Sequence, residues 1–173
     1  MERLLTTTID SPVGVLTLAA VDRGLRAVLW AEEPAGRVAL VGAECVDDAD
    51  EVTPARRVLG EATRQLNEYF EGTRRRFDLP LDPVGTEFQQ KAWQVLRTIP
   101  YGTTMTYGEQ AARLGDRNKS RAVGSANGRN PIGIIVPCHR VVGSNGALTG
   151  FAGGMDAKAW LLRHEQGADT LPF

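Results

Sequence analysis

The sequence contains few of the residues that bind transition metals or form disulfides. Its 173 residues include only two cysteines and two histidines. Cys45 and Cys138 lie far apart in the chain, and with His139 and His164 they offer no paired-ligand spacing of the kind that zinc sites use. We therefore expect no metal site. Two distant cysteines are also more typical of a protein in a reducing compartment than of a disulfide framework.

The sequence also lacks long hydrophobic runs. Nowhere do about 18 apolar residues follow one another, which is the length that a membrane-spanning helix needs. The first ten residues lack the basic segment and apolar stretch of a secretory signal. With 42% hydrophobic and 24% charged residues, the composition is typical of a globular protein with a real core. We expect a cytoplasmic protein without a membrane partner.

The chain has almost no net charge, but its two halves differ in sign. The formal charge is −1, of which residues 1–83 carry −5 and residues 84–173 carry +4. Between residues 113 and 129, Asp116 is the only acidic residue, and five are basic: Arg113, Arg117, Lys119, Arg121 and Arg129. This excess favours an anionic partner, although a charge run is also typical of an ordinary solvated face.

Residues 1–83 predict an α/β domain with a small antiparallel sheet. Short runs rich in Val and Leu indicate three strands, at residues 4–9, 13–20 and 24–30. Residues 31–50 are expected to form a surface connection, because their acidic end is unsuited to a core element.

One helix is expected to cover this sheet. Apolar residues recur at helical spacing from Pro54 to Glu71, with Thr53 as the cap and Gly72 as the end. The following segment, residues 74–83, predicts an extended connector. We therefore place a domain boundary near residue 83, between domains 1–83 and 84–173.

Residues 84–173 predict a mainly α-helical domain that contains a helix-turn-helix. Capping-box patterns at residues 86–89 and 106–109 each open a helix. Residues 115–118 predict a turn, and residues 119–127 a further short helix. Two short helices across a glycine-containing turn are typical of a helix-turn-helix. A closing helix is expected at residues 156–166, with Ala159, Leu162 and either Leu161 or Trp160 facing inward.

The second helix of this motif carries small side chains. Residues 122–126 are Ala, Val, Gly, Ser and Ala, whereas a major-groove helix needs long polar side chains that reach base edges. Small residues permit close approach to the narrower minor groove, with Arg121 projecting into it. The alternative is that these residues only allow tight packing inside the protein.

Cys138 and His139 follow a short apolar run. Residues 134–136 predict a buried strand, which should end at Pro137 and leave Cys138 at a turn or helix start. Unpaired backbone N–H groups there favour a thiolate, and His139 can relay the proton away. The alternative is that Cys138 is a small core residue. Residues 128–131 join this run to the helix-turn-helix, so the two features are expected to share one site.

Several motifs together resemble one known family. The run IVPCHRVV at residues 135–142 follows RAVG at 121–124 and the Asn130–Pro131 pair, and it precedes TGFAGG at 149–154 and Lys158 to Glu165. In this order they resemble the O6-alkylguanine-DNA alkyltransferases, also called methylated-DNA–protein-cysteine methyltransferases. The likeness is close over residues 85–167, and residues 1–83 fit the family's ribonuclease-like N-terminal domain.

The resemblance implies a DNA repair protein. It would flip O6-alkylguanine out of double-stranded DNA, bind the minor groove through its helix-turn-helix, and move the alkyl group irreversibly onto Cys138. Such a reaction needs a thiolate and no cofactor, and it ends after one turnover. The resemblance also implies a monomer, with cooperative assembly on DNA left open.

The same resemblance assigns roles to residues. His139 would deprotonate Cys138, Glu165 would orient the imidazole, and Asn130 would support the turn before the cysteine. The implied DNA contacts are Tyr107, Lys119, Arg121, Ala126, Asn127 and Ser144. The implied guanine pocket contains Tyr107, Val141, Phe151, Ala152 and Gly153.

Plainer interpretations of three of these residues stay open. Tyr107 could be a core aromatic residue, Asn130 a simple turn residue, and His164 rather than Glu165 could face the site. The chain also departs from some relatives, because residues 1–83 contain no His for an N-terminal zinc site and Ala152 stands where some members have serine.

Two other classes of function remain as alternatives. A helix-turn-helix regulator or lesion-binding module without chemistry would lose nothing on Cys138→Ala. A thiol hydrolase built on Cys138 and His139 would turn over esters or peptides many times, but no oxyanion donor set is evident in the sequence.

Overall fold

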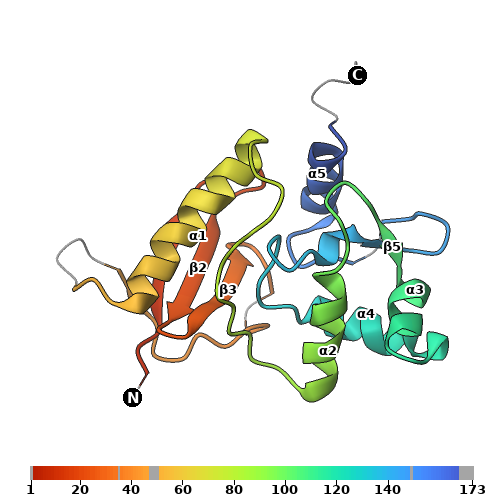
Figure 1. The fold of residues 1–173 in the computed structure, drawn as a ribbon, viewed down its shortest axis with the longest axis horizontal. Helices are drawn as coiled ribbons and strands as arrows, with labels where there is room; N and C mark the ends of the chain where they lie inside the picture. The colour runs from red at the N-terminus through yellow and green to blue at the C-terminus, as the bar shows by residue number, and fades with distance from the viewer. Residues whose placement is uncertain (1, 35, 47–50, 149, 168–173) are drawn as a thin grey trace. The chain divides into compact units, whose positions relative to one another are not determined.

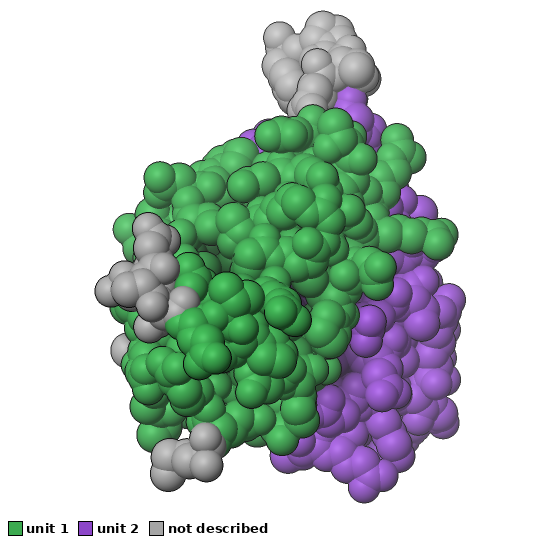
Figure 2. All heavy atoms as spheres, turned by 60° about the vertical axis from the view of Figure 1, so that its left-hand side comes forward, with its two compact units in different colours: residues 1–84 green, residues 85–173 purple. Residues whose placement is uncertain are grey.

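The computed structural model describes residues 2–34, 36–46, 51–148 and 150–167. The chain folds into two compact units, Met1–Val84 and Gly85–Phe173 (Figures 1 and 2). Within the described ranges, no helix is both long and apolar enough to cross a membrane.

Unit 1 contains a four-stranded sheet in the order β3-β2-β1-β4. The strands β1 (Leu5–Ile9), β2 (Leu16–Val21) and β3 (Gly24–Trp30) are antiparallel neighbours, which confirms the three predicted strands. The expected surface connection contributes a strand that the sequence did not indicate, β4 (Glu44–Cys45), parallel to β1. It is exposed and held by backbone hydrogen bonds to β1, so it needs no apolar side chains.

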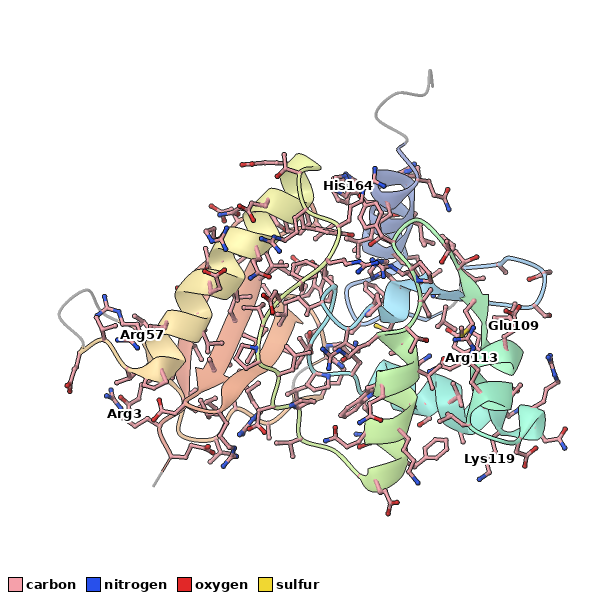
Figure 3. The ribbon with its side chains drawn as sticks, in the orientation of Figure 1. Arg3, Arg57, Glu109, Arg113, Lys119 and His164 are labelled. Carbon is pink, nitrogen blue, oxygen red and sulfur yellow. The ribbon has the colours of Figure 1, made fainter. Side chains whose placement is uncertain are left out.

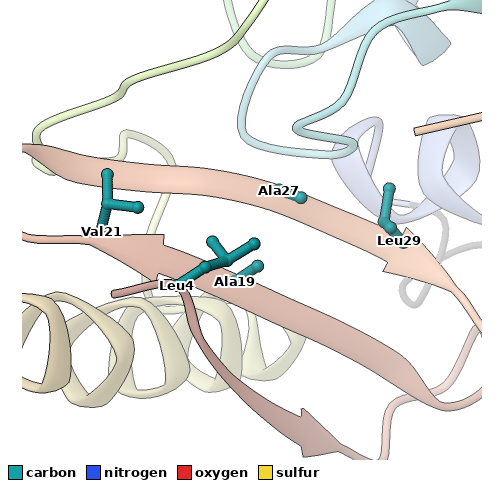
Figure 4. Close-up of a cluster of buried hydrophobic side chains, with 5 residues drawn as sticks. All are labelled: Leu4, Ala19, Val21, Ala27 and Leu29. Carbon is teal, nitrogen blue, oxygen red and sulfur yellow. The ribbon is translucent and has the colours of Figure 1, made fainter. Parts of the chain in front are cut away.

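Helix α1 (Pro54–Glu71) packs against β1, β2 and β3 (Figure 1). Thr53 caps it by accepting a hydrogen bond from the N–H of Arg56, and Gly72 ends it in the left-handed region at φ 83°. The predicted helix and both of its ends are confirmed. Alternate residues of β2 and β3 form an apolar cluster with the residue before β1 (Figure 4): Leu4, Ala19, Val21, Ala27 and Leu29.

The connector after α1 is tied to the start of β3. Leu25 donates its N–H to the carbonyl of Pro80 and accepts one from Asp82, both at 2.8 Å. A Cβ atom on Gly24 would lie 2.6 Å from the Pro80 oxygen, so this close approach requires glycine. The extended segment therefore belongs to the packing of unit 1.

Unit 2 is mainly helical. Its helices are α2 (Glu87–Leu96), α3 (Tyr107–Arg113), α4 (Ser120–Gly128) and α5 (Met155–Glu165). Thr86 and Gln89 form the predicted capping box of α2, and Thr106 caps α3 by accepting from the N–H of Glu109. A 3₁₀ turn, η1 (Arg117–Lys119), joins α3 to α4, so these elements form the helix-turn-helix.

Two expectations for unit 2 were wrong. Residues 134–136 are buried but form a turn, in which Ile134 has φ 70° and the N–H of Val136 donates to Ile132 at 3.0 Å. A short apolar run indicates burial without fixing the backbone conformation. On α5, Leu161 and Leu162 face inward as expected, but Ala159 is only half-buried and Lys158 is buried in addition.

Candidate active site

A side chain from the preceding loop holds the turn before Cys138. The amide nitrogen of Asn130 donates to the carbonyl of Val136 at 2.8 Å, and its oxygen accepts the N–H of Ile132 at 3.0 Å. Asn130 is buried, so these two bonds satisfy polar groups that lie away from water. The left-handed conformation of Ile134 lies inside the loop that Asn130 closes.

Cys138 begins a short 3₁₀ helix, η2 (Cys138–Arg140). The predicted turn or helix start after Pro137 is therefore confirmed, but the expected unpaired N–H is not found at the cysteine. The N–H of Cys138 donates to the carbonyl of Val136 at 2.8 Å. The thiol is partly exposed, whereas the next residue, His139, is fully buried.

Behind the cysteine lies a buried network of three ionisable side chains. Nε2 of His139 is 2.7 Å from one carboxylate oxygen of Glu165 on α5. Arg140 donates to both oxygens of the same carboxylate, at 2.7 and 3.0 Å, and also to the carbonyl of Ile99 at 2.7 Å. Two adjacent residues of η2 thus share one carboxylate.

The pKa shifts define the protonation states in this network. Burial raises the pKa of Glu165, but the hydrogen bonds from His139 and Arg140 and the positive charge of Arg140 outweigh it and hold that pKa far below its usual range. Burial lowers the pKa of His139, and Arg140 lowers it further, although Glu165 acts in the opposite direction. We therefore take Glu165 as ionised and His139 as neutral.

These states determine which nitrogen of His139 carries the proton. An ionised carboxylate can only accept hydrogen bonds, so Nε2 must donate to Glu165. Nδ1 is then the acceptor nitrogen, and among the described side chains and backbone groups it has no hydrogen-bond partner. The residue beside Cys138 therefore presents a buried, unpaired proton acceptor.

Sequence reasoning gave no role to two residues of this site. Arg140 belongs to the PCHR motif at residues 137–140. Its position close to apolar residues indicates that its charge needs a buried partner. Lys158 is 1% exposed and donates from Nζ to the carbonyl of Val141 at 2.6 Å. It lies three and four residues before Leu161 and Leu162, on the same inward face of α5, and this spacing could have identified it.

His164 does not take the place of Glu165. Its ring stacks on Trp160 at a centroid distance of 4.7 Å, one turn earlier on α5. Of the two neighbours, Glu165 is the residue that contacts His139.

The exposed basic residues lie on the helix-turn-helix. Arg117, Lys119 and Arg121 are exposed on η1 and α4, and Arg129 follows directly. Arg113 on α3 is also exposed, and Figure 3 labels it together with Lys119. These side chains form what we call the basic face: Arg113, Arg117, Lys119, Arg121 and Arg129.

Two of the implied DNA contacts are buried. Ala126 is 3% exposed, and its carbonyl accepts a hydrogen bond from the Trp93 indole at 2.8 Å. Asn127 is 7% exposed, and its side chain exchanges two hydrogen bonds with Gln110, at 2.8 and 3.0 Å. The carbonyl of Ala126 and the side chain of Asn127 thus hold α4 to its neighbours inside unit 2, and both residues are buried away from the basic face.

The other implied contacts lie nearer the surface. Tyr107, the first residue of α3, is half-buried with its ring beside Gly124, where a Cβ would be 3.7 Å away. Ser144 is exposed in a turn closed by a 2.8 Å bond from Gly146 to Gly143. In the implied pocket, Val141 is buried on β6 (Val141–Val142), and residues 151–153 are half-buried before α5.

Two family models together match nearly the whole chain. Residues 87–167 match the family described as 6-O-methylguanine DNA methyltransferase, DNA binding domain. Residues 4–83 match its ribonuclease-like domain. The chain belongs to the 6-O-methylguanine DNA methyltransferase family.

Curated relatives of this methyltransferase family cover nearly the whole chain. A methylated-DNA–protein-cysteine methyltransferase of Methanosarcina acetivorans is 46% identical, over 90% of this chain and 94% of its own length. One from Mycolicibacterium paratuberculosis is 44% identical, over 95% of this chain and 96% of its own. The crystal structure of Mycobacterium tuberculosis OGT in complex with DNA is 43% identical, with a TM-score of 0.82 over 95% of this chain and 93% of that one.

Among the described residues, no three His, Cys, Asp or Glu side chains gather as metal ligands would. Cys45 lies exposed at the sheet edge of unit 1.

Proposed function

We propose that this protein repairs DNA by transferring the alkyl group of O6-alkylguanine in double-stranded DNA to the sulfur of its own Cys138. A bond forms between Sγ and the alkyl carbon while the bond from that carbon to guanine O6 breaks. The electron pair of the broken bond stays on guanine, which takes up a proton and leaves as the normal base. Sulfur is suited to this displacement because a thiolate is a soft, strong nucleophile.

The observation that carries the proposal is the contact between His139 and Glu165. Because Nε2 donates to the carboxylate, Nδ1 is the nitrogen that accepts the proton of the Cys138 thiol. Adjacent side chains diverge from the backbone, so one bridging water completes the path. Arg140 keeps Glu165 ionised, and Glu165 stabilises the imidazolium that forms.

The reaction ends after one turnover. A thioether on Cys138 is a poor leaving group, and the site needs no cofactor because the protein itself is the acceptor. Asn130 holds the turn that presents the cysteine, through its bonds to Ile132 and Val136.

We propose that the basic face binds the minor groove of DNA. Its cations attract the phosphates, and the exposed small residues Ala122 and Ser125 on α4 permit a close approach. Arg121 is the long side chain that takes the place of the flipped nucleotide. Tyr107 and Ser144 contact the phosphates, and residues 151–153 with Val141 receive the base.

We also propose how the chain is divided into domains and in which oligomeric state it acts. Residues 84–173 carry both DNA binding and alkyl transfer, and residues 1–83 form a separate domain. The protein acts as a cytoplasmic monomer, and a concentration series on long duplex DNA would reveal any cooperative assembly.

The test is the intact mass of the protein after incubation with O6-benzylguanine. We expect one benzyl adduct per molecule, mapped to the peptide that contains Cys138. Cys138→Ser should take up none, whereas Cys45→Ser, which removes the exposed thiol of unit 1, should react like the wild-type protein. An unmodified wild-type protein, or an adduct on Cys45 alone, would refute the proposal.

A further inference from the structure

Helix α4, which carries Arg121, has a small apolar contact surface. It packs against α2 and α3, and its buried residues are Val123, Ala126 and Asn127. Hydrophobic burial has no preferred direction, so Val123 and Ala126 can bury α4 without fixing how it is rotated or shifted along its neighbours. The direction has to come from polar contacts, and Asn127 is the buried polar side chain of this helix.

Asn127 and Gln110 of α3 bind each other through both ends of their amide groups. Nδ2 of Asn127 donates to Oε1 of Gln110 at 2.8 Å, and Nε2 of Gln110 donates to Oδ1 of Asn127 at 3.0 Å. Nε2 of Gln110 also donates to the carbonyl of Ala92 on α2 at 3.1 Å. Because a carbonyl can only accept, this last bond fixes which end of each amide faces the other. The amide pair, Gln110 and Asn127, therefore joins three helices in one orientation.

The amide pair lies away from water. Gln110 is 0% exposed and Asn127 is 7% exposed. A buried amide that loses its partner costs free energy, so a rotation or shift of α4 that separates the pair is penalised. Single buried asparagines fix the register of coiled coils for the same reason. The amide pair thus excludes positions of α4 that apolar packing alone would allow.

Asn127 also connects α4 to the turn before Cys138. Its backbone carbonyl accepts the N–H of Asn130 at 3.1 Å, and the side chain of Asn130 closes that turn. Arg121 lies on the same helix, in the first turn of α4. The position of α4 therefore affects both the side chain that faces the DNA and the backbone that leads to the sulfur.

We propose that Gln110 and Asn127 are positioning residues, which hold α4 where Arg121 and the sulfur reach the same nucleotide of duplex DNA. This inference rests on the proposed function and adds to it two residues that touch neither the base nor the reacting atoms. The amide pair is needed for transfer from duplex DNA, in which Arg121 and Cys138 act together. It is not needed for transfer from a free guanine base, which reaches Cys138 without the helix-turn-helix.

The test compares these two substrates in the double variant Gln110→Met/Asn127→Leu. Both amides are removed and apolar side chains of similar volume remain, so the double variant should melt close to the wild type. With saturating duplex DNA that contains O6-methylguanine, transfer to Cys138 should slow about tenfold or more, because a misplacement of about 1 Å can cost about 100-fold in rate. With free O6-benzylguanine, the rate of adduct formation should equal that of the wild type.

Gln65→Met is the matched control. Gln65 is also a buried glutamine, 1% exposed, and its amide bonds to the backbone of Asp78 in unit 1 at 2.8 and 3.0 Å. Its replacement should lower the melting temperature and leave both rates unchanged. A fall in the duplex rate as large as that of the double variant would show that lost stability causes the effect, and this would overturn the inference.

Three results for the double variant would also overturn the inference. They are an unchanged rate with saturating duplex DNA, an equal fall with both substrates, and a weaker affinity for duplex DNA with no change of rate at saturation. A wild-type protein that takes up no alkyl group from either substrate would instead refute the proposed function, and the inference with it.

A second variant, Asn127→Ser, covers the case in which the double variant does not fold. The serine hydroxyl is polar but too short to bond both ends of the Gln110 amide, so α4 loses the same constraint. We expect the same difference between the two substrates, and equal rates for Asn127→Ser and the wild type on duplex DNA would contradict the proposal.

Discussion

The pair formed by Arg140 and Glu165 should be strongly coupled, and the structure gives the size of the effect. Their side chains are 9% and 1% exposed and share two hydrogen bonds. Removing one partner leaves the other charge buried and uncompensated, which costs about 3–5 kcal/mol in the free energy of unfolding. We expect this cost for Arg140→Met and for Glu165→Gln alone.

The double variant should cost much less than the sum of the single variants. With both charges removed, neither remains buried without a partner, so the coupling energy should be roughly 2 kcal/mol or more. The matched control is the pair of Glu87 and Lys91, which is 3.1 Å apart but 86% and 61% exposed. Its coupling should be at most about 0.5 kcal/mol, because water screens it.

The assay is urea unfolding at neutral pH followed by tryptophan fluorescence. The chain has three tryptophans, and a Trp30→Phe background leaves Trp93 and Trp160, which both lie in unit 2. The signal then reports the unit that contains the pair. Additive costs for Arg140→Met and Glu165→Gln would refute the reasoning, because they would mean that the two charges do not stabilise each other.

Three other outcomes follow from the site. Asn130→Leu leaves the buried N–H of Ile132 without its partner, while the carbonyl of Val136 keeps the N–H of Cys138, so unfolding should become easier by about 1–3 kcal/mol and transfer to Cys138 should slow; an unchanged urea midpoint would argue against the bridging role. The lowered pKa of His139 gives stability that is complete above about pH 6.5 and lost as pH falls, and the lowered pKa of Glu165 adds a further loss below about pH 4.5. Thermal melts that are flat from about pH 7 to 5 would contradict the first shift, and melts that are flat from about pH 4.5 to 3 would contradict the second. Arg121→Ala should slow transfer from duplex DNA about tenfold or more and leave the reaction with free O6-benzylguanine unchanged, whereas Arg57→Ala on α1 should change neither rate.

Elements with strong local signals could be predicted from the sequence. The capping box at Thr86, the left-handed end of α1 at Gly72 and the period of α1 all come from neighbours along the chain, and the structure has them. The edge strand β4 could not be predicted, because its pairing with β1 depends on backbone hydrogen bonds between residues about 40 positions apart.

The candidate site likewise contains features that the sequence predicted and features that it did not. A family resemblance identified Cys138 and His139 as neighbours in one motif, but it did not indicate that Arg140 would share the carboxylate of Glu165. The left-handed Ile134 was also unpredictable, since a β-branched residue disfavours that conformation and the turn is held by tertiary contacts such as the Asn130 bridge. The sequence motif therefore identifies the reacting residues, whereas tertiary contacts determine their protonation states and orientation.

The most direct test of the account counts the methyl groups that one protein molecule removes from duplex DNA containing O6-methylguanine. With DNA in excess, we expect a plateau at one methyl group per protein, all of it on the peptide that contains Cys138. Continued removal beyond one equivalent, or repair that leaves Cys138 unmodified, would contradict the claim that this cysteine is the final acceptor.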